Sequence, residues 1–379
     1  MEIYRSIADV PPARWDNAAG GDLGFDRPLL ETCEQCADHR CVYFVHDPPG
    51  GSAVAATGLE FRDPASSNPL TDLMLGRLDA RLPLLRRAFG RLLILRAPFA
   101  YGCGIASVGA SDEGKRLHSF LAELERYADG EGLAIVALNV NSENGSPASI
   151  FEQRDYARTI SRPIARAHVT WSNWDEYLQM AKQGSPSAES TIRHEVRRAE
   201  KLGLRVSTWD PETLSEDRLR QLYDGHHLRM NLTPLRIAPD FFTRSLRSMG
   251  ERAIVLVARL GAEVIGSTFI LTGNGRSVLP LVGIDPEKGR HAFCYFNLVF
   301  YVPMRLATTH GWSAITYGSG AYAAKIRRGC RAELSRVFWR PHGGMARRYC
   351  RVITRAHATV YGLKYRRELA AREFSLPSK

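Results

Sequence analysis

One short stretch carries most of the residues that could do chemistry. In "YGSGAYAAKIRRGC", Tyr317–Cys330, a glycine–serine turn follows an apolar run, and Lys325 then stands among small residues. The backbone N–H groups of a glycine-rich turn and a lysine ammonium are donors that stabilise a developing oxyanion. The two arginines that come next, Arg327 and Arg328, have the planar fork that suits phosphate. Lys325 is therefore a candidate for handling a reacting carbonyl, with a phosphate ligand and a solvated surface lysine as the alternatives.

A second polar cluster lies in "YDGHHLRMN", where a histidine could bind an acceptor group or act as a base. The candidates for substrate binding are Tyr317, Ser319, His226, His227 and Arg229, and Tyr322 joins Lys325 as a catalytic candidate. Packing remains the alternative for the two tyrosines, because aromatic residues near strand ends usually pack. No Ser-His-Asp or Cys-His order stands out, so no covalent intermediate is predicted, and Cys330 is interpreted as a buried free thiol.

A basic helix is predicted across the middle of the chain, between the Ser185-Pro186-Ser187 start signal and the stop at Gly203. Its cations share one face at helical spacing, and its apolar residues face inward. The cations are Arg193, Arg197, Arg198 and Lys201. This stripe is either a solvated face or a surface for phosphates. The segment after Arg340 is a second basic helix, which either binds an anionic ligand or covers a sheet edge.

Length, charge and composition limit the classes of protein to which the chain can belong. The chain has 379 residues, enough for two domains, and carries a formal charge of +11 with a pI near 9.5. That excess favours an anionic partner but does not require one. No targeting segment and no run long enough to span a membrane is present, so we expect a cytoplasmic protein. "CEQCADHRC" has one C-x-x-C pair without a second, which favours reduced thiols over zinc, and no metal or cofactor is predicted.

The order of predicted elements repeats. The first half contains a hairpin around "PPGG", a helix over 111–132 and a buried strand over 133–140. The second half contains three β-rich runs, then a helix over 290–311 with a kink expected at Pro303, and a strand over 312–318. The three runs are Ala253–Leu260, Glu263–Thr272 and Ser277–Ile284. The repeat predicts an α/β fold with two similar halves.

Three stretches together resemble one family. They are "STIRHEVRRAEKLGLRV", "VIGSTFILTGNGRSVLPLVGIDP" and "FYVPMRLATTHGWSAITYGSGAYAAKIRRGC". In this order they are similar to the second domain of the FemAB/FemX-like branch of the GNAT acyltransferase superfamily. The resemblance implies two tandem GNAT-like domains, residues 1–165 and 166–379, with a cleft between them and the basic helix at the end of the second. It also implies transfer of an aminoacyl group from aminoacyl-tRNA to an amine, with Lys325 matching the lysine that stabilises the carbonyl oxygen.

Departures from the family narrow the expected substrates. The coiled-coil arm of some members is absent, and nothing demands a large lipid-linked acceptor, so we expect a small soluble amine in antibiotic biosynthesis and no membrane partner. "PEKGRHAFCYFN" lacks the second glycine of the turn that holds the pyrophosphate of acyl-CoA, which favours tRNA as donor. The residues expected to bind tRNA are Arg193, Arg197, Arg198, Lys201, Arg327 and Arg328. The alternatives are an acyl-CoA-dependent N-acyltransferase and a non-enzymatic nucleic-acid-binding protein.

Overall fold

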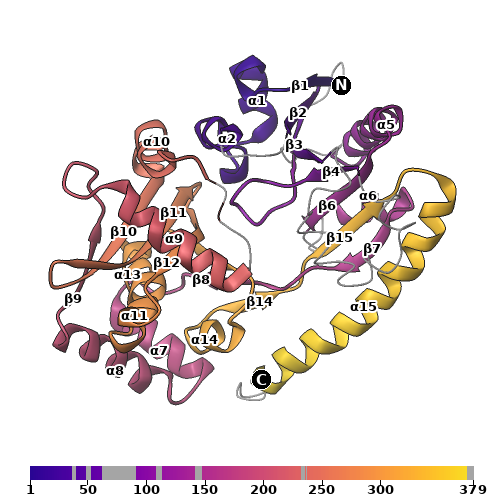
Figure 1. Cartoon of the computed structure of the whole chain (residues 1–379). Helices are drawn as coiled ribbons and strands as arrows, with labels where there is room; N and C mark the ends of the chain where they lie inside the picture. Colours follow the sequence, from indigo (N-terminus) through magenta and orange to yellow (C-terminus); the bar gives the residue numbers. More distant parts are fainter. Residues whose placement is uncertain are drawn as a thin grey trace. The chain divides into compact units, whose positions relative to one another are not determined.

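The computed structural model describes two units (Figure 1). The described residues are 1–35, 40–47, 53–61, 91–107, 113–140, 147–231, 235 and 237–373. The first unit combines Met1–Arg162 with Leu334–Arg367, and the second is built from Pro163–Glu333. The sequence predicts a single boundary after residue 165, with the C-terminal helix in the second domain. The structure differs, because the chain returns to the first unit at Leu334 and completes its sheet there.

The sheet of the first unit has the strand order β1-β2-β3-β4-β6-β15-β7, with β5 paired to β3. Its strands are β1 (Glu2–Tyr4), β2 (Arg40–His46), β3 (Val54–Phe61), β4 (Leu92–Leu95), β5 (Ile105–Ser107), β6 (Ala134–Val140), β7 (Ala157–Ile160) and β15 (Arg336–Arg340). The pairing of β2 with β3 is the predicted hairpin, and β4 and β6 run parallel. The last strand, β15, lies antiparallel between β6 and β7.

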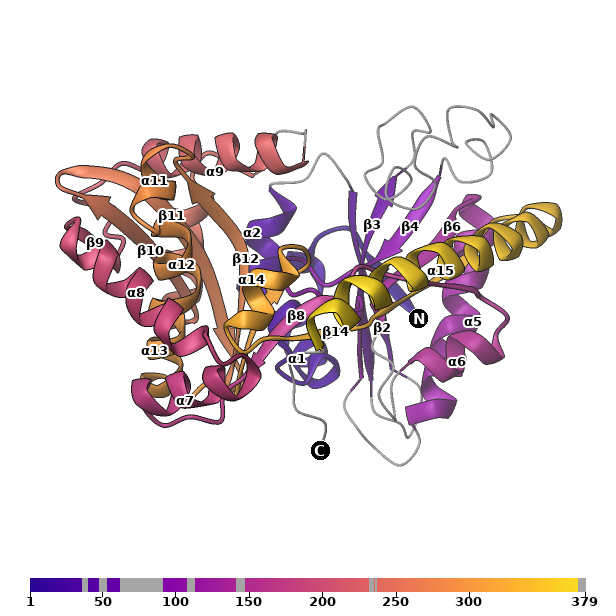
Figure 2. The same ribbon diagram turned by 90° about the horizontal axis from the view of Figure 1, so that it is seen from below.

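Helices cover both faces of this sheet. They are α1 (Pro12–Ala19), α2 (Arg27–Glu34), α5 (Glu113–Glu131), α6 (Ala148–Gln153) and α15 (Gly344–Glu373), with 3-10 turns at Ile7–Asp9 and Leu23–Phe25. Helices α5 and α6 bury their apolar residues against one face. Helices α1 and α2 pack on part of the other face, and α15 lies across the rest of it (Figure 2).

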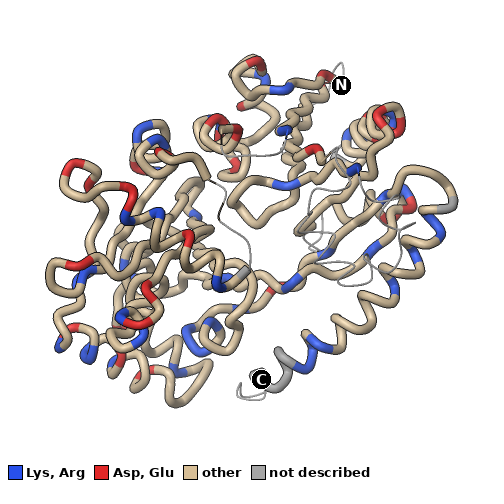
Figure 3. Tube along the Cα trace, viewed as in Figure 1, with Lys and Arg blue, Asp and Glu red and all other residues tan. Residues whose placement is uncertain are grey.

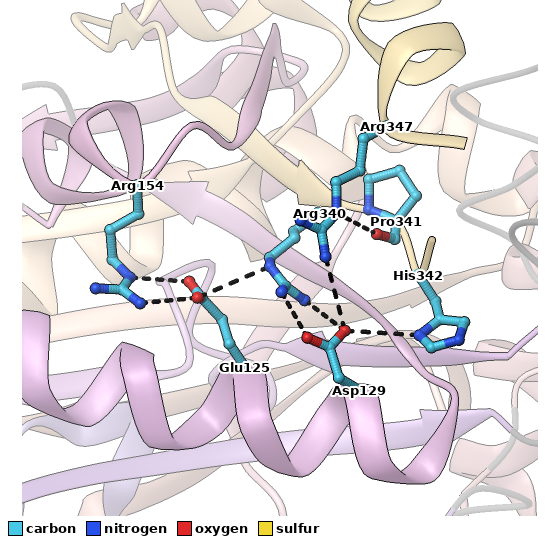
Figure 4. A network of polar contacts seen from close by, with 7 residues as sticks. All are labelled: Glu125, Asp129, Arg154, Arg340, Pro341, His342 and Arg347. Atoms are coloured by element: carbon cyan, nitrogen blue, oxygen red, sulfur yellow. Dashed lines mark hydrogen bonds and ion pairs between the residues drawn. The ribbon is translucent and has the colours of Figure 1, made fainter. Parts of the chain in front are cut away.

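A row of ion pairs fastens β15 and the start of α15 to α5 (Figure 4). Arg340 donates to both carboxylate oxygens of Asp129, at 2.9 and 2.7 Å. Arg154 donates to both oxygens of Glu125, also at 2.9 and 2.7 Å. The hydrogen bonds from Arg340, outweighing partial burial, lower the pKa of Asp129. The bidentate contact of Arg340 fixes the returning segment to α5, and that of Arg154 joins the end of α6 to the same helix.

The second unit has a seven-stranded sheet in the order β14-β8-β13-β12-β11-β10-β9. Its strands are β8 (Ile164–His168), β9 (Leu204–Thr208), β10 (Ala253–Leu260), β11 (Glu263–Gly273), β12 (Arg276–Ile284), β13 (Ala314–Gly318) and β14 (Arg331–Glu333). Its helices are α7 (Trp174–Gly184), α8 (Ala188–Lys201), α9 (Glu216–Asn231), α10 (Phe241–Met249), α11 (Lys288–His291), α12 (Cys294–Phe296), α13 (Val302–Thr309) and α14 (Tyr322–Arg327), with a 3-10 turn at Gly250–Arg252. The predicted strands of this half are confirmed to within two residues.

The expected long helix is irregular instead of simply kinked. A π-helical turn, Asn297–Tyr301, separates α12 from α13, and Pro303 lies in the first turn of α13. The helical residues run without a break from Cys294 to Thr309, so the missing N–H of Pro303 falls within the helix, directly after the π turn. The irregularity therefore takes the form of a π turn just before the proline, and all five residues of that turn are buried.

Close backbone contact places α9 on β12. A Cβ atom at Gly283 would lie 2.6 Å from the backbone nitrogen of Tyr223 and 2.7 Å from the carbonyl carbon of Leu222. Only glycine allows the helix to approach the strand so closely. By contrast, nothing lies within 4 Å of a Cβ built at Gly225, which is in the same helix.

We predict that Gly283→Ala lowers the free energy of unfolding of the second unit by about 2 kcal/mol or more, because the backbone of α9 must move away. The matched control, Gly225→Ala, should raise it by up to about 1 kcal/mol, because alanine favours the helix and meets no neighbour. Urea unfolding followed by circular dichroism measures both changes. Equal midpoints for the wild type and Gly283→Ala would contradict the proposed contact.

Candidate functional site

The candidate site lies where two parallel strands part. β12 and β13 pair only from Arg276–Val278 to Ala314–Thr316. Beyond this segment β12 continues beside β11 to Ile284, while β13 turns into the loop that carries Lys325. Pro280 lies in the diverging part of β12, where its missing N–H costs no bond to β13. The divergence leaves one edge of β12 unpaired with β13.

The loop after β13 has a specific backbone. Gly318 and Gly320 have φ angles of 68° and 80°, in the region that favours glycine, and Ala321 follows at 49°. A left-handed alanine is uncommon and is kept only where the surroundings require it. The turn reverses the chain, and α14 begins at once at Tyr322.

Lys325 is buried and holds this turn. Its Nζ donates to the carbonyl oxygens of Tyr317, Gly318 and Ser319, at 2.9, 3.0 and 3.1 Å. An ammonium has three hydrogens, so each one already has an acceptor. Burial lowers the pKa of Lys325 to about 8. Lys325 is therefore not a solvated surface lysine; in this conformation it organises the loop, and contact with a substrate oxyanion would require it to release a carbonyl.

The neighbouring candidates are mostly interior residues. Tyr322 is buried and donates its hydroxyl to the carbonyl of Pro163 at 2.8 Å. Tyr317 is buried and stacks on Phe300 with ring centroids 4.7 Å apart. Ser319 is exposed. Of these three candidates, only Ser319 presents its side chain to solvent.

A buried ion pair that the sequence analysis missed lies beneath the loop. Arg328 Nη2 donates to Glu195 Oε2 at 2.5 Å, and Nε donates to the hydroxyl of Tyr301 at 2.9 Å. Nη1 donates to the carbonyl of Ala324, and the guanidinium stacks 3.6 Å from the centroid of the Phe296 ring. Tyr301 in turn donates to the same carboxylate oxygen of Glu195. The expectation that Arg328 contacts phosphate is therefore corrected: its side chain is only 2 % exposed.

A signal for this pair was present in the sequence. Glu195 lies among the inward-facing positions Ile192, Val196 and Ala199 of α8, and all four are buried. A carboxylate on an apolar helix face needs a buried cation as its partner. That partner could not be chosen from the sequence alone, because Arg328 is more than one hundred residues away.

The basic stripe of α8 divides into two parts. Arg193 pairs with Glu189 and Asp175, each at 3.1 Å, so its charge is already compensated. Arg197, Arg198 and Lys201 are exposed, as is Arg327. In the described part of the chain these four cations show no ion pair within 4 Å. They remain the candidates for phosphate contact.

The histidine cluster lies at the far end of β12. His226 Nδ1 accepts from Arg229 Nη2 at 3.0 Å, and the same nitrogen of Arg229 lies 3.5 Å from the carbonyl oxygen of Ile284. Burial, followed by the charge of Arg229 and by His227, lowers the pKa of His226 to about 4. His226 is therefore neutral at pH 7 with its proton on Nε2, which suits a hydrogen-bond donor better than a general base. His227 is half-buried beside it on α9.

The turn after β12 is filled by a carboxylate of the chain. Asp285 Oδ1 accepts from the backbone N–H groups of Glu287 and Lys288, at 3.0 and 2.9 Å. The N–H of Gly289 bonds to the carbonyl of Asp285 at 3.0 Å. These are the amides that would be needed to hold a pyrophosphate at this turn.

The cysteines that the structure describes have no visible catalytic role. Cys330 is a buried free thiol, as predicted, and burial raises its pKa to about 12. Cys33 and Cys41 are buried and reduced, while Cys36 and His39 lie outside the described residues. Within the described ranges, no three His, Cys, Asp or Glu side chains gather as a metal site. No helix of the described chain has the length and apolarity to cross a membrane.

Comparison with known proteins places this geometry in a family. The sequence model of the FemAB-like family, described as peptidoglycan biosynthesis/recognition, matches residues 92–361. No curated protein matches the sequence significantly.

Solved structures share the fold at low identity. The C-terminal domain of a candidate lysylphosphatidylglycerol synthetase from Agrobacterium fabrum matches with a TM-score of 0.57 and 11% identity, over 93% of this chain and 97% of that one. FemX matches with a TM-score of 0.55 and 12% identity, over 89% of this chain and 97% of FemX. L-PGS from Bacillus licheniformis matches with a TM-score of 0.55 and 12% identity, over 92% of this chain and 97% of L-PGS. They confirm the predicted α/β fold of two GNAT-like domains. The family match, which covers most of the sequence, shows that this chain belongs to the FemAB-like family of aminoacyl-tRNA-dependent transferases.

Proposed function

We propose that this protein transfers an aminoacyl group from aminoacyl-tRNA to the amine of a small acceptor, forming an amide bond. The family match over residues 92–361 carries the proposal. The reaction needs an amine held close to an ester carbonyl and donors for the developing oxyanion. The parted ends of β12 and β13 supply a stretch of β12 that is not paired with β13 and a fixed turn, which suit both needs.

The turn after β12 supports tRNA over acyl-CoA as donor. In this turn the amides of Glu287 and Lys288 are directed at Asp285, so a pyrophosphate would have to displace a carboxylate of the protein. The negative charge of Asp285 would also repel the incoming phosphates. Exposed cations on α8 instead suit a longer polyanion.

The acceptor is proposed to be a small soluble amine of an antibiotic pathway. Helices α7 and α8, with 11 and 14 residues, are too short for the paired arm of the family members that have one. One structural relative is named as a lysylphosphatidylglycerol synthetase, which makes a lipid the competing class of acceptor.

We predict that an amide product forms from a mixture of charged tRNAs and amine acceptors, and that RNase abolishes it. The measurement is mass spectrometry of the products, with acyl-CoA substituted for tRNA in a parallel reaction. RNase-insensitive transfer from acyl-CoA would establish the alternative N-acyltransferase. RNA binding without any transfer to any amine would favour the non-enzymatic alternative.

Lys325 is proposed to hold the turn that presents donors to the reacting carbonyl. We predict that Lys325→Met lowers kcat/KM by about 100-fold, the scale of losing an oxyanion donor. The same change should lower the unfolding midpoint, because three carbonyls lose their buried partner. Lys325→Arg should recover stability only in part, because a planar fork cannot meet three converging carbonyls.

Arg327→Met serves as the control for stability, because its side chain is exposed and it lies two residues after Lys325 in the same helix. Its unfolding midpoint should equal that of the wild type. Full activity of Lys325→Met in a folded protein would remove Lys325 from the site.

The exposed cations of α8 are proposed to bind tRNA phosphates. We predict that the triple change Arg197→Gln, Arg198→Gln and Lys201→Gln reduces the slope of log affinity against log salt concentration by about 2 to 3. Arg193→Gln is the matched control from the same helix, because its charge is compensated by Glu189 and Asp175. Filter binding of tRNA over a salt series measures the slopes. Equal slopes for the triple variant and the wild type would contradict the proposed surface.

A further inference from the structure

The outer face of α15 carries an exposed apolar stripe. Tyr349 is 60 % exposed, Val352 66 %, Val360 63 % and Leu363 53 %, and Ala356 between them is also exposed. At 100° per residue the five positions fall within an arc of about 80° on a straight helix. Isolated exposed apolar residues are ordinary, but a stripe that follows one helix marks an interaction surface.

The opposite face of α15 attaches the helix to the first unit. Cys350, Thr354 and Tyr365 are buried on that face. His357 Nδ1 lies 2.8 Å from the hydroxyl of Thr159, in β7. The apolar stripe therefore faces away from the sheet that anchors the helix, and the helix does not need the stripe for its own packing.

Cations flank the stripe. From Gly344 to Arg367 the helix contains no acidic residue, and Figure 3 shows only basic charges along it. Arg347 and Arg351 are paired with Asp129 and Asp155 of the first unit. The cations without a carboxylate partner in the described part of the chain are Arg348, Arg355, Lys364, Arg366 and Arg367. On the same helical projection Arg348, Arg355 and Arg366 border one side of the stripe, and Lys364 borders the other.

We propose that α15 is an interfacial helix that docks this protein on the surface of an anionic lipid bilayer. A bilayer surface uses both features at once: the apolar stripe enters the boundary between headgroups and acyl chains, and the flanking cations meet anionic headgroups. RNA or an acidic peptide in water would use the arginines but would leave exposed valine and leucine unexplained. From Arg348 to Arg367 the contact is about 30 Å long.

This docking requires no membrane-spanning segment. We expected no membrane partner because nothing in the sequence demands a lipid-linked acceptor, but an interfacial helix lies in the plane of the surface and needs neither such an acceptor nor a membrane-spanning run. The inference is independent of the proposed transfer reaction, because it concerns only which surface the first unit rests on.

The test is flotation of the full-length protein with vesicles of phosphatidylcholine alone or mixed equally with phosphatidylglycerol. The wild type should float with the anionic vesicles, and added salt should weaken the binding. The variant with Val352→Ser, Val360→Ser and Leu363→Ser keeps every charge. Its affinity for the anionic vesicles should fall by about tenfold or more, because the inserted apolar area is lost.

Charge is tested separately. The variant with Arg348→Gln, Arg355→Gln and Arg366→Gln should lose its preference for anionic vesicles. Its matched control, Arg126→Gln, Arg205→Gln and Arg247→Gln, removes the same charge from exposed positions elsewhere and should float like the wild type. All the substituted side chains are exposed, so circular dichroism and unfolding midpoints should be unchanged.

Four outcomes would overturn the proposal. The wild type could fail to bind anionic vesicles, or the serine variant could bind as well as the wild type. The α15 arginine variant could lose tRNA binding while no form floats, which would assign the helix to RNA. The serine variant could convert a dimer to a monomer in sedimentation without any vesicle binding, which would assign the stripe to a second copy of the chain.

Discussion

The buried pair of Arg328 and Glu195 is the contact on which the candidate site depends. Burying two charges costs several kcal/mol per ion unless hydrogen bonds and a close partner offset it. Here the guanidinium meets Glu195, the Tyr301 hydroxyl and a backbone carbonyl, and the ring of Phe296 covers it. Since the three partners come from α8, the π turn and α14, none of these elements can shift without leaving a charge unpaired.

Lys325 depends on this arrangement. It lies one turn before Arg328 on α14, so fixing the end of that helix directs the ammonium back at the carbonyls that end β13. The turn is thereby held from both sides, by glycine conformations in the chain and by a buried cation. A turn held in this way presents its groups without reorganising when a substrate arrives, which is the property that electrostatic catalysis requires.

The hydrophobic pattern of the sequence was sufficient to predict most strands of the second unit, because strands such as β10 and β12 are apolar runs next to glycine turns. The same pattern placed the Lys325 loop at the end of a strand. It could not show that Lys325 and Arg328 are buried, because burial depends on packing partners that are distant in the sequence. The π turn at Asn297–Tyr301 has no simple sequence pattern and could not be predicted. Pro303 indicated only that the helix is irregular in this region. The return of β15 was missed because its partners in β6 lie some two hundred residues earlier.

The return of the chain to the first unit at β15 also makes the two units differ in how their sheets are completed. In each sheet an antiparallel strand lies beside the second member of the parallel pair: β8 beside β13, and β15 beside β6. The chain supplies β8 at the start of the second unit, and Ala314 of β13 comes 146 positions after its partner His168. It supplies β15 only after the second unit is finished, with Arg336 196 positions after its partner Val140, so the first sheet closes the longer loop, at an entropic cost that grows with the logarithm of loop length. The bidentate contact of Arg340 with Asp129 forms where that loop closes, and its charge-assisted hydrogen bonds offset part of the cost.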